Sequence, residues 1–479
     1  MSADWPRLTV AELEEQGTIL VVDGNHGQYR PLPHEFGEGR YAYIRATDMD
    51  GGLVLFDAAA RINDTAFKRI RKGVGAPGDV LFSHKGTVGK LALVPMDAPL
   101  YVCSPQTTLW RTLDETNLDR RYLYCYMRSQ EFIEQWFARK GETDMADYVS
   151  LTAQRELTVA LPPLPEQRAI ARVLGGLDDK IELNRRMNRT LEDLARGVFR
   201  SWFVDFDPVL RPAPAPTAAP TSTRTHPPHP RFPTRLVDSP LGPIPEGWRV
   251  STIGQEVTVV GGSTPSTDEP KFWEGGNHCW VTPRDLSRLT DPVVIDCERR
   301  ITGAGLTQIS SGLMPRGTVL LSSRAPIGYL AIADVPVAVN QGFIGLKCDK
   351  GLPGVFALRW CEENMEEVLS RAGGTTFAEI SKAAFRPIPM VVPTAEVIEA
   401  FARAAQGWHD QIVANVRQTR QLAALRDALL PQLLSGEIRL HEADRAVDAA
   451  LRSTATSTPP ERPARPGAGT VHAGAKGGA

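Results

Sequence analysis

Cationic and amide side chains of this chain gather around two short blocks of nearly the same sequence. Residues 78–92 read GDVLFSHKGTVGKLA, and residues 317–331 read GTVLLSSRAPIGYLA. Each block begins with a predicted strand and continues into a loop, and loops that follow strands often carry binding residues. Cations neutralise phosphates, and polar side chains read base edges. The two blocks therefore predict two related nucleic-acid-binding surfaces.

Further side chains suited to DNA contact surround both blocks. Arg45 and Arg284 follow predicted strands, and Gln106 and Gln341 occupy similar places downstream, where glutamine can pair bidentately with adenine. The candidate DNA-binding residues are Arg45, Lys68, Arg69, Lys72, His84, Lys85, Lys90, Gln106, Arg284, Arg288, Ser323, Arg324, Gln341 and Lys382. The alternative for each one is a residue of a solvated charged face, or a turn-capping glutamine.

Motifs for a chemical step are missing from the sequence. Residues 86–90 (GTVGK) lack the spacing of the phosphate loop GxxxxGK(S/T), and the second block has Tyr329 in place of Lys90. The chain has no GxGxxG after a predicted strand, no GxSxG and no HExxH. His278 and Cys279 form the only adjacent metal-capable pair, without a second pair nearby. We therefore expect a non-catalytic chain with no metal and no bound cofactor.

Length and composition set the protein class. A chain of 479 residues with 42% hydrophobic residues predicts about three globular domains. The net charge of −2 argues against a uniformly basic surface but allows local basic patches. The six cysteines lack CxxC spacing, which predicts reduced and mostly buried thiols in a cytoplasmic protein. No apolar run approaches the about 18 residues of a membrane span, and no secretory signal is recognised.

The elements that must position these residues are two mixed α and β domains and two long helices, an α+β fold. One helix is expected around residues 120–139. The predicted boundaries are 1–161 for the first domain, 162–206 for the first long helix, 207–240 for a proline-rich linker, 241–393 for the second domain, 394–440 for the second long helix and 441–479 for a disordered tail.

The two long helices carry matching apolar seams with spacings of three and four residues, as in heptad repeats. Asn184 and Asn415 fall at the same seam position when the helices are aligned, and a polar residue there fixes the register. The seam residues are Ile170, Leu177, Ile181, Asn184, Leu191, Trp202, Trp408, Ile412, Asn415, Leu422 and Leu429. This pattern favours pairing of the helices with each other, the alternative being that each covers its own domain.

Four segments resemble a known family. Residues 162–170 (PPLPEQRAI), 177–184 (LDDKIELN) and 199–203 (FRSWF) resemble the specificity subunit of type I restriction-modification enzymes, and residues 429–438 (LLPQLLSGEI) are similar to its closing motif. Residues 393–397 (PTAEV) depart from the PPLPEQ form at the start of the second helix. The resemblance extends over roughly residues 5–440.

The resemblance implies two target-recognition domains, each reading one half of a split sequence in double-stranded DNA. It also implies that the long helices form an antiparallel coiled-coil spacer, with a pseudo-two-fold repeat. The family's specificity subunit is non-catalytic and recruits two modification subunits, which bind S-adenosylmethionine and methylate adenine. It also recruits restriction subunits, which use ATP and Mg.

Two alternatives to a DNA specificity subunit remain. One is a duplicated scaffold that assembles protein partners through its coiled coil and does not bind DNA. The other is a stand-alone nuclease or methyltransferase, which the missing motifs disfavour.

Overall fold

The computed structural model describes residues 5–142, 147–211, 232–374, 378–438 and 440–455. The chain forms two compact units, each of which is described by itself below. Unit 1 comprises Met1–Leu174 and Ala428–Ala479, and unit 2 comprises Gly175–Asp427. Within the described residues, no helix is long and apolar enough to cross a membrane.

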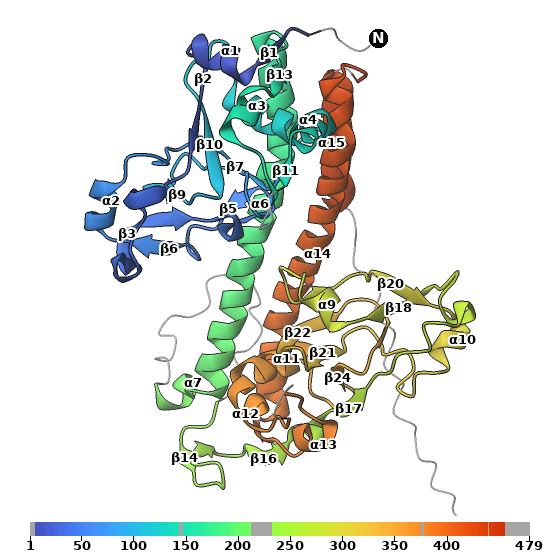
Figure 1. The fold of residues 1–479 in the computed structure, drawn as a ribbon. Coiled ribbons are helices and arrows are strands. Elements are labelled where there is room, and N and C mark those ends of the chain that lie inside the picture. The colour runs from blue at the N-terminus through green and yellow to red at the C-terminus, as the bar shows by residue number, and fades with distance from the viewer. Residues whose placement is uncertain (1–4, 143–146, 212–231, 375–377, 439, 456–479) are drawn as a thin grey trace, which may run out of the picture. The chain divides into compact units, whose positions relative to one another are not determined.

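Unit 1 contains two small sheets that share a core (Figure 1). The first is antiparallel, in the order β2 (Ile19–Asp23), β10 (Thr107–Thr112), β7 (Val80–Ser83) and β8 (Leu91–Leu93). The second has the order β6 (Ala60–Ile62), β3 (Phe36–Ile44) and β9 (Tyr101–Cys103), with β3 and β9 parallel. Buried apolar residues of both sheets, including Ile44, Leu81 and Leu109, form one hydrophobic cluster.

Short elements complete unit 1. They include β1 (Arg7–Thr9) paired with β13 (Thr158–Ala160), β4 (Met49–Asp50) paired with β5 (Leu53–Val54), β11 (Gly141–Glu142) paired with β12 (Asp147–Tyr148), α1 (Val10–Glu15), α2 (Asp64–Arg69), α3 (Arg120–Met127), α4 (Gln130–Ala138) and α5 (Leu151–Arg155). The single helix expected around residues 120–139 is two helices. The reason is Ser129, whose hydroxyl accepts a hydrogen bond from the Phe132 amide and so caps a new helix.

Unit 2 repeats the strand order of unit 1. Its larger sheet runs β17 (Thr258–Gly261), β24 (Phe343–Lys347), β21 (Val319–Ser323), β22 (Ile327–Ala333) and β19 (Val293–Val294). Its smaller sheet runs β20 (Arg299–Ile301), β18 (His278–Val281) and β23 (Val337–Val339), again with one parallel pair. The strands β16 (Arg249–Thr252) and β25 (Pro389–Val392) pair as β1 and β13 do. The repeat predicted from two short blocks therefore extends to the strand order of both sheets, with β19 as an additional strand in unit 2.

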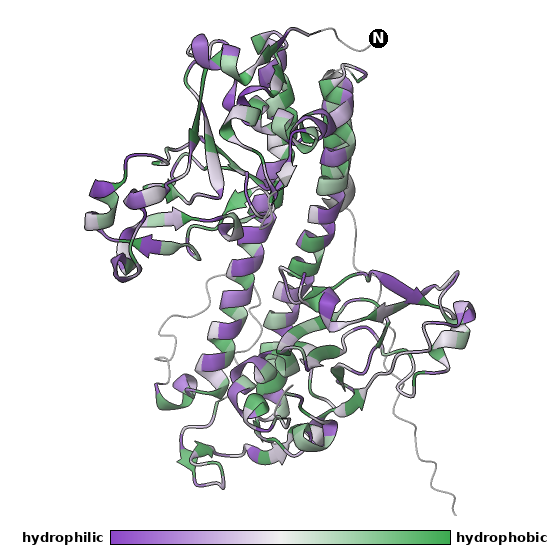
Figure 2. Ribbon diagram, in the orientation of Figure 1, coloured by the Kyte–Doolittle hydropathy of each residue, from purple (hydrophilic) through white to green (hydrophobic). Residues whose placement is uncertain are grey.

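The two long helices are α6 (Leu164–Phe203) and α14 (Ala395–Leu434), of 40 residues each. At about 1.5 Å per residue each is about 60 Å long. Within unit 2 they run antiparallel and in contact, since Asp178 pairs with Arg426 and Asn184 with Gln418, while Phe199 packs on Phe401. Figure 2 shows hydrophilic and hydrophobic residues alternating along both helices.

The predicted seam residues lie on buried or partly buried faces of these helices. Those that are fully buried are Ile170, Leu177, Ile181, Asn184, Ile412, Asn415, Leu422 and Leu429. Leu191, Trp202 and Trp408 are partly buried against hydrophobic clusters. Asn184 donates from Nδ2 to Gln418 Oε1 over 2.9 Å, and Asn415 donates to Asn188 Oδ1 over 2.8 Å. The asparagines thus form a polar layer inside the helix pair.

The predictions for the segments that follow the long helices need correction. The linker begins with α7 (Asp207–Leu210) and ends in β14 (Leu236–Val237), which pairs with β15 (Ile244–Pro245), and residues 212–231 lie outside the described part. The tail prediction is wrong for residues 441–455, which belong to α15 (Leu440–Ala455), and residues 456–479 lie outside the described part. This segment folds because it is alanine-rich and buries Ala443, with Asp444 facing Arg172.

The cysteine prediction is wrong for one pair. Cys279 and Cys297 are joined by a disulfide, with their Cα atoms 5.7 Å apart. The cause is tertiary, because the loop before β20 brings Cys297 back beside β18. Cys103, Cys125 and Cys361 are buried, and burial raises the pKa of the Cys103 and Cys361 thiols. Across the described residues, no group of three or more His, Cys, Asp or Glu side chains is arranged to hold a metal.

Candidate functional site

The candidate site in each unit is one edge of the larger sheet, called here the loop edge. In unit 1 it comprises residues 24–26, 84–90 and 104–106, which extend from β2, β7 and β10. In unit 2 it comprises residues 262–264, 323–329 and 340–342, which extend from β17, β21 and β24. The registers make the edges equivalent, because Thr107 lies opposite Ser83 as Phe343 lies opposite Ser322.

A buried serine closes the hairpin loop in both edges. The Ser83 hydroxyl accepts a hydrogen bond from the Lys90 amide over 2.8 Å, and the Ser322 hydroxyl accepts one from the Tyr329 amide over the same distance. Neither serine side chain is exposed. The serine repeated in the two blocks therefore maintains loop shape and is not available to a ligand. Ser323, one of the predicted binding residues, is buried as well.

Lys85 and Arg324 are the equivalent cations of the two edges. The backbone of Lys85 bridges to Tyr148, and that of Arg324 bridges to Glu379 at the matching position. The Lys85 side chain is exposed. The Arg324 guanidinium lies 3.7 Å from the Glu379 carboxylate. The two edges therefore share a cation position, and in unit 2 an acidic neighbour partly offsets its charge.

Three predicted binding residues of unit 1 are structural, because their side chains bond within the unit. His84 is buried and its ring nitrogens lie within 3.2 Å of the Val149 and Pro105 carbonyl oxygens. The Lys90 ammonium donates to two backbone carbonyl oxygens, those of Ala46 and Met49.

Arg69 is the third structural residue. Its guanidinium binds the buried Glu35 carboxylate through two nitrogens, at 2.7 and 2.5 Å. This hydrogen bonding lowers the pKa of Glu35 to about 2. The sequence presented Arg69 as one of several cations of α2, whereas its partner comes from a segment 34 residues earlier.

The other predicted cations divide between the loop edges and more distant surfaces. Lys72 is exposed and precedes Gly73, which packs against the backbone of Asn25 in the loop edge. Lys68 is exposed on α2. In unit 2, the Lys382 ammonium lies next to Gly261 at the end of β17. Arg288 pairs with Glu298 at 2.7 Å.

Arg45 and Arg284 follow equivalent strands but are not equivalent residues. The Arg45 amide donates to Asp48, and the Thr282 amide donates to Asp285 in the same way. Arg45 therefore corresponds to Thr282, two residues before Arg284. Arg45 also pairs with Asp48 through its side chain, and both arginines are exposed.

Gln106 and Gln341 both lie exposed in the turn before the central strand of the larger sheet. The carbonyl that accepts from the loop amide belongs to Gln106 in unit 1 and to Gly342 in unit 2. The glutamines are therefore one position apart on the same turn. Their similar placement was predicted, but the difference of one residue depends on backbone hydrogen bonds that link distant segments.

Sequence reasoning missed the loops that follow β2 and β17. Gly24 and Gly262 begin these loops where the backbone passes against the 103–106 and 339–342 turns. An added Cβ would lie 1.8 Å from the Ser104 oxygen or 1.9 Å from the Val339 oxygen, so only glycine fits. The residues that follow, including the exposed His26 and Thr264, thereby join the loop edges. A glycine at both strand ends was the available signal.

A second missed feature lies on the smaller sheet of unit 2. The exposed Arg299 guanidinium stacks 3.9 Å from the ring centre of Trp273 and 5.1 Å from that of Trp280. These cation–π contacts place a cation on an aromatic surface. The three residues come from separate segments, so their spacing carries no sequence signal.

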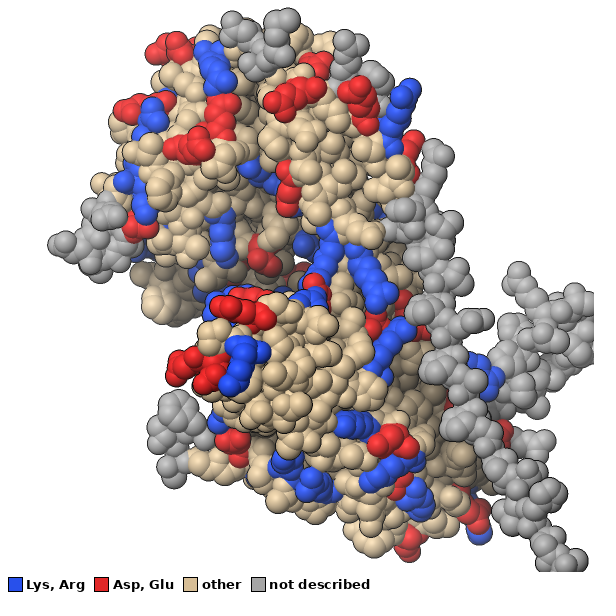
Figure 3. All heavy atoms as spheres, turned by 90° about the vertical axis from the view of Figure 1, so that its right-hand side faces the viewer, with Lys and Arg blue, Asp and Glu red and all other residues tan. Residues whose placement is uncertain are grey.

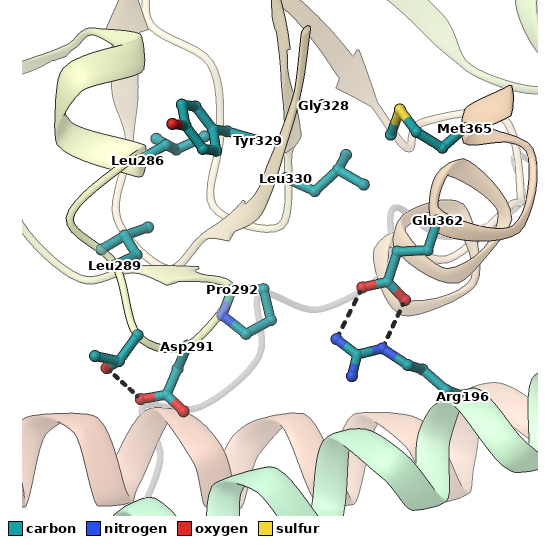
Figure 4. Close-up of a pocket in the computed structure, with 11 residues that line it drawn as sticks. Arg196, Leu286, Leu289, Asp291, Pro292, Gly328, Tyr329, Leu330, Glu362 and Met365 are labelled. Carbon is teal, nitrogen blue, oxygen red and sulfur yellow. Dashed lines mark hydrogen bonds and ion pairs between the residues drawn. The ribbon is translucent and has the colours of Figure 1, made fainter. Parts of the chain in front are cut away.

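A groove of about 440 Å³ lies in unit 2 between α6 and the 286–292 segment (Figure 4). Arg196 pairs with Glu362 at one end, and Asp291 accepts a hydrogen bond from Thr290 at the other. Burial raises the pKa of Asp291. The charged side chains lining the groove are thus bonded to protein neighbours, and the arrangement does not present a nucleophile beside a base.

Basic charge is local on the molecular surface. On the face shown in Figure 3, lysine and arginine side chains are interspersed with acidic ones and with uncharged surface. This pattern agrees with the net charge of −2. That face therefore carries no broad positive field, and any attraction for phosphate there depends on the placement of individual cations.

Comparison with known proteins gives consistent matches. The family model described as Type I restriction modification DNA specificity domain matches residues 34–193 and 245–403. The MjaIX specificity subunit of the type I restriction enzyme of Methanocaldococcus jannaschii is 32% identical over 197 residues, 40% of this chain and 44% of that protein. The HindI specificity subunit of Haemophilus influenzae is 25% identical over 440 residues, 83% of this chain and 94% of that protein.

A similarity to a solved structure concerns the fold. The crystal structure of a type I restriction-modification system S subunit from M. genitalium superposes with a TM-score of 0.52 at 15% sequence identity. The match covers 90% of this chain and 96% of that one. At this identity the similarity concerns the fold alone.

Proposed function

Because this chain belongs to the family of the type I restriction modification DNA specificity domain, with two copies of that domain, we propose that it is the DNA specificity subunit of a type I restriction-modification complex. One observation carries the proposal. Two loop edges have the same backbone frame, yet their exposed side chains differ. A repeated frame with different contact residues suits a protein that reads two different half-sites of one bipartite DNA sequence. The chain itself is a non-catalytic subunit.

The long helices are proposed to form a coiled-coil spacer between the half-sites. Their length of about 60 Å is comparable to one to two turns of DNA at about 34 Å per turn. The polar layer of Asn184, Asn188 and Asn415 supports this role, because buried polar residues select one register of paired helices.

Partner subunits are proposed to dock on the helices. Leu183, Met187 and Leu194 are exposed on α6 at spacings of four and seven residues, so they follow one stripe of the helix. Such a stripe suits packing against a helix of a partner. We propose that two modification subunits carrying S-adenosylmethionine bind in this region, and that restriction subunits using ATP and Mg join them. A cytoplasmic location is part of the same proposal.

A scaffold that does not bind DNA is disfavoured by the family match. The scaffold and the specificity subunit are distinguished by measuring the DNA affinity of the reconstituted complex at several salt concentrations. Contacts to phosphate give a steep negative slope, whereas a scaffold gives none.

The proposal is tested by exchanging one recognition domain. Residues 1–161 are replaced by the corresponding domain of a relative with a different specificity, and methylated adenines are mapped after reconstitution with modification subunits. We expect one half-site to change and the other to stay. The reciprocal exchange of residues 241–393 is the matched control and should change only the other half-site. A change of both half-sites by either exchange would contradict the proposal that each domain recognises one half-site.

A further inference from the structure

We infer that Gln341 reads an adenine in the half-site bound by unit 2 and that Thr264 is its positioning residue. This inference rests on the proposed function and adds a residue pair to it. The Thr264 hydroxyl donates to Gln341 Oε1 over 2.6 Å, although the two residues are 77 positions apart in the chain. Both side chains are exposed on the loop edge, so the side-chain amide of Gln341 remains accessible to a ligand.

The backbone beneath this pair is held on both sides. The Ser263 amide donates to the Val339 oxygen over 3.1 Å, and the Ser263 hydroxyl donates to the Gln308 oxygen over 3.1 Å. In the facing turn, Asn340 Oδ1 accepts from the Gly342 amide over 2.9 Å, which closes an Asx turn around Gln341. The pair is therefore mounted on rigid loops, as a base-reading residue requires.

The hydrogen bond from Thr264 leaves the Gln341 amide with a free acceptor and free donors, which is the combination that adenine requires. Oε1 retains one lone pair, and Nε2 retains both N–H groups. In the major groove adenine presents the N6 amino donor beside the N7 acceptor, whereas guanine presents two acceptors. An amide whose oxygen is held in place by Thr264 therefore accepts from N6 and donates to N7, while guanine would place its O6 against the fixed oxygen.

Unit 1 lacks this arrangement. The position equivalent to Thr264 is His26, whose Nδ1 lies 2.9 Å from the Gly24 oxygen. Gln106 lies one position later on the turn, and its side-chain amide has no hydrogen-bond partner among the described residues. The fixed amide is thus specific to the half-site read by unit 2.

The experiment measures the affinity of the reconstituted complex, with its modification subunits, for DNA duplexes that differ by a single atom of one adenine. Duplexes carry the sequence mapped for the wild-type complex, with each adenine replaced in turn by 7-deazaadenine, which lacks the N7 acceptor. For the wild-type complex we expect one adenine of the unit 2 half-site to show a roughly 5- to 150-fold loss of affinity. Gln341→Ala should abolish the penalty at that adenine alone. Thr264→Val should reduce it several-fold, and Thr264→Ser, which retains the hydroxyl, should restore it.

The control is Thr307→Val, since Thr307 is an exposed threonine of unit 2 whose hydroxyl donates to the Ala304 oxygen and accepts from Gln308 Nε2, and so is not the partner of Gln341. It should leave every penalty unchanged. The inference is overturned if Gln341→Ala keeps the full penalty at each adenine, or if Thr264→Val and Thr307→Val behave alike. If the wild-type complex binds no specific sequence, the proposed function itself fails, which is a separate outcome.

Discussion

Lys85 and Lys90 are five residues apart in one hairpin loop and have opposite environments. Lys85 is exposed at the loop edge, whereas the Lys90 ammonium donates to the backbone oxygens of Ala46 and Met49. In the second copy the residues at these positions are Arg324 and Tyr329. The position of Lys85 keeps a cation in both copies, and that of Lys90 does not. At the residue scale, a structural lysine is recognised by its hydrogen bonds within the protein, whereas a lysine suited to binding is exposed.

Replacing Lys85 by glutamine should weaken DNA binding of the complex without changing its sequence preference. The reason is the loss of one contact to phosphate, which should lower the slope of log affinity against log salt concentration by about 1. Affinity is measured at several salt concentrations for cognate and unrelated duplexes. The unfolding free energy should stay unchanged. A changed preference between bases would show that Lys85 contacts a base instead.

Replacing Lys90 by methionine should destabilise the protein. The substitution removes hydrogen bonds to two carbonyl oxygens from a charged donor, which contribute about 1–3 kcal/mol. Urea denaturation compares this variant with Lys85→Met, the matched control from the same loop. Equal stability of the two variants would contradict the structural role of Lys90.

At the scale of elements, α14 is attached to the second recognition domain by buried polar groups. Asp334 is buried and pairs with Arg316 of its own domain and with Arg417 of α14. On the other helix, Glu192 pairs with the buried Arg359 at 2.7 Å. Such pairs require defined geometry, because Asp334, Glu192 and Arg359 would each be a buried charge if left unpaired. They therefore orient the domain on its helices more than they stabilise it.

His409 of α14 makes this attachment sensitive to pH. Burial lowers the pKa of His409 from 6.5 to about 4, so the folded protein keeps this imidazole neutral. Between about pH 4 and pH 6.5 the unfolded chain binds a proton at His409 that the folded chain does not bind. The stability present above pH 6.5 is therefore lost as pH falls toward 4, by up to about 3 kcal/mol. Urea denaturation at pH 7, 6 and 5 should show this loss.

The control for this prediction is His409→Gln, which cannot titrate. Its unfolding free energy should fall less between pH 7 and pH 5 than that of the wild type. The exposed His34 gives a matched variant, His34→Gln, which should follow the wild type. An identical pH dependence of the wild type and His409→Gln would exclude His409 as the source.

At the scale of the whole molecule, the helices are proposed to set the distance between the half-sites. Removing one heptad from the middle of both α6 and α14 shortens each by about 10 Å and keeps the buried faces aligned. We expect the tolerated DNA spacer to shorten by about one to three base pairs at about 3.4 Å each, with both half-sites unchanged. Mapping of methylated adenines measures both quantities. An unchanged spacer would contradict the role of the helices.

The sequence by itself determined the repeat, the two long helices and the family. The helix seams and the position of the repeated cation follow from local patterns, namely heptad spacing and glycine at turns, whereas the strand order came from the tertiary structure. These features depend on residues close together in the chain, which is why the two blocks and the seam residues were sufficient to predict them. The same local patterns gave no indication of Thr264, His26 or the Trp273 and Arg299 contact.

Tertiary structure decided which polar residues are free to meet a ligand. His84, Lys90 and Arg69 have the same side-chain chemistry as binding residues, but each is bonded to a carbonyl or carboxylate from a distant segment. Thr264 reaches Gln341 only because the glycines at the strand ends let two loops pass closely. A hydrogen-bond partner far away in the chain leaves no periodic signal, and so burial and pairing emerge only when the sheets assemble.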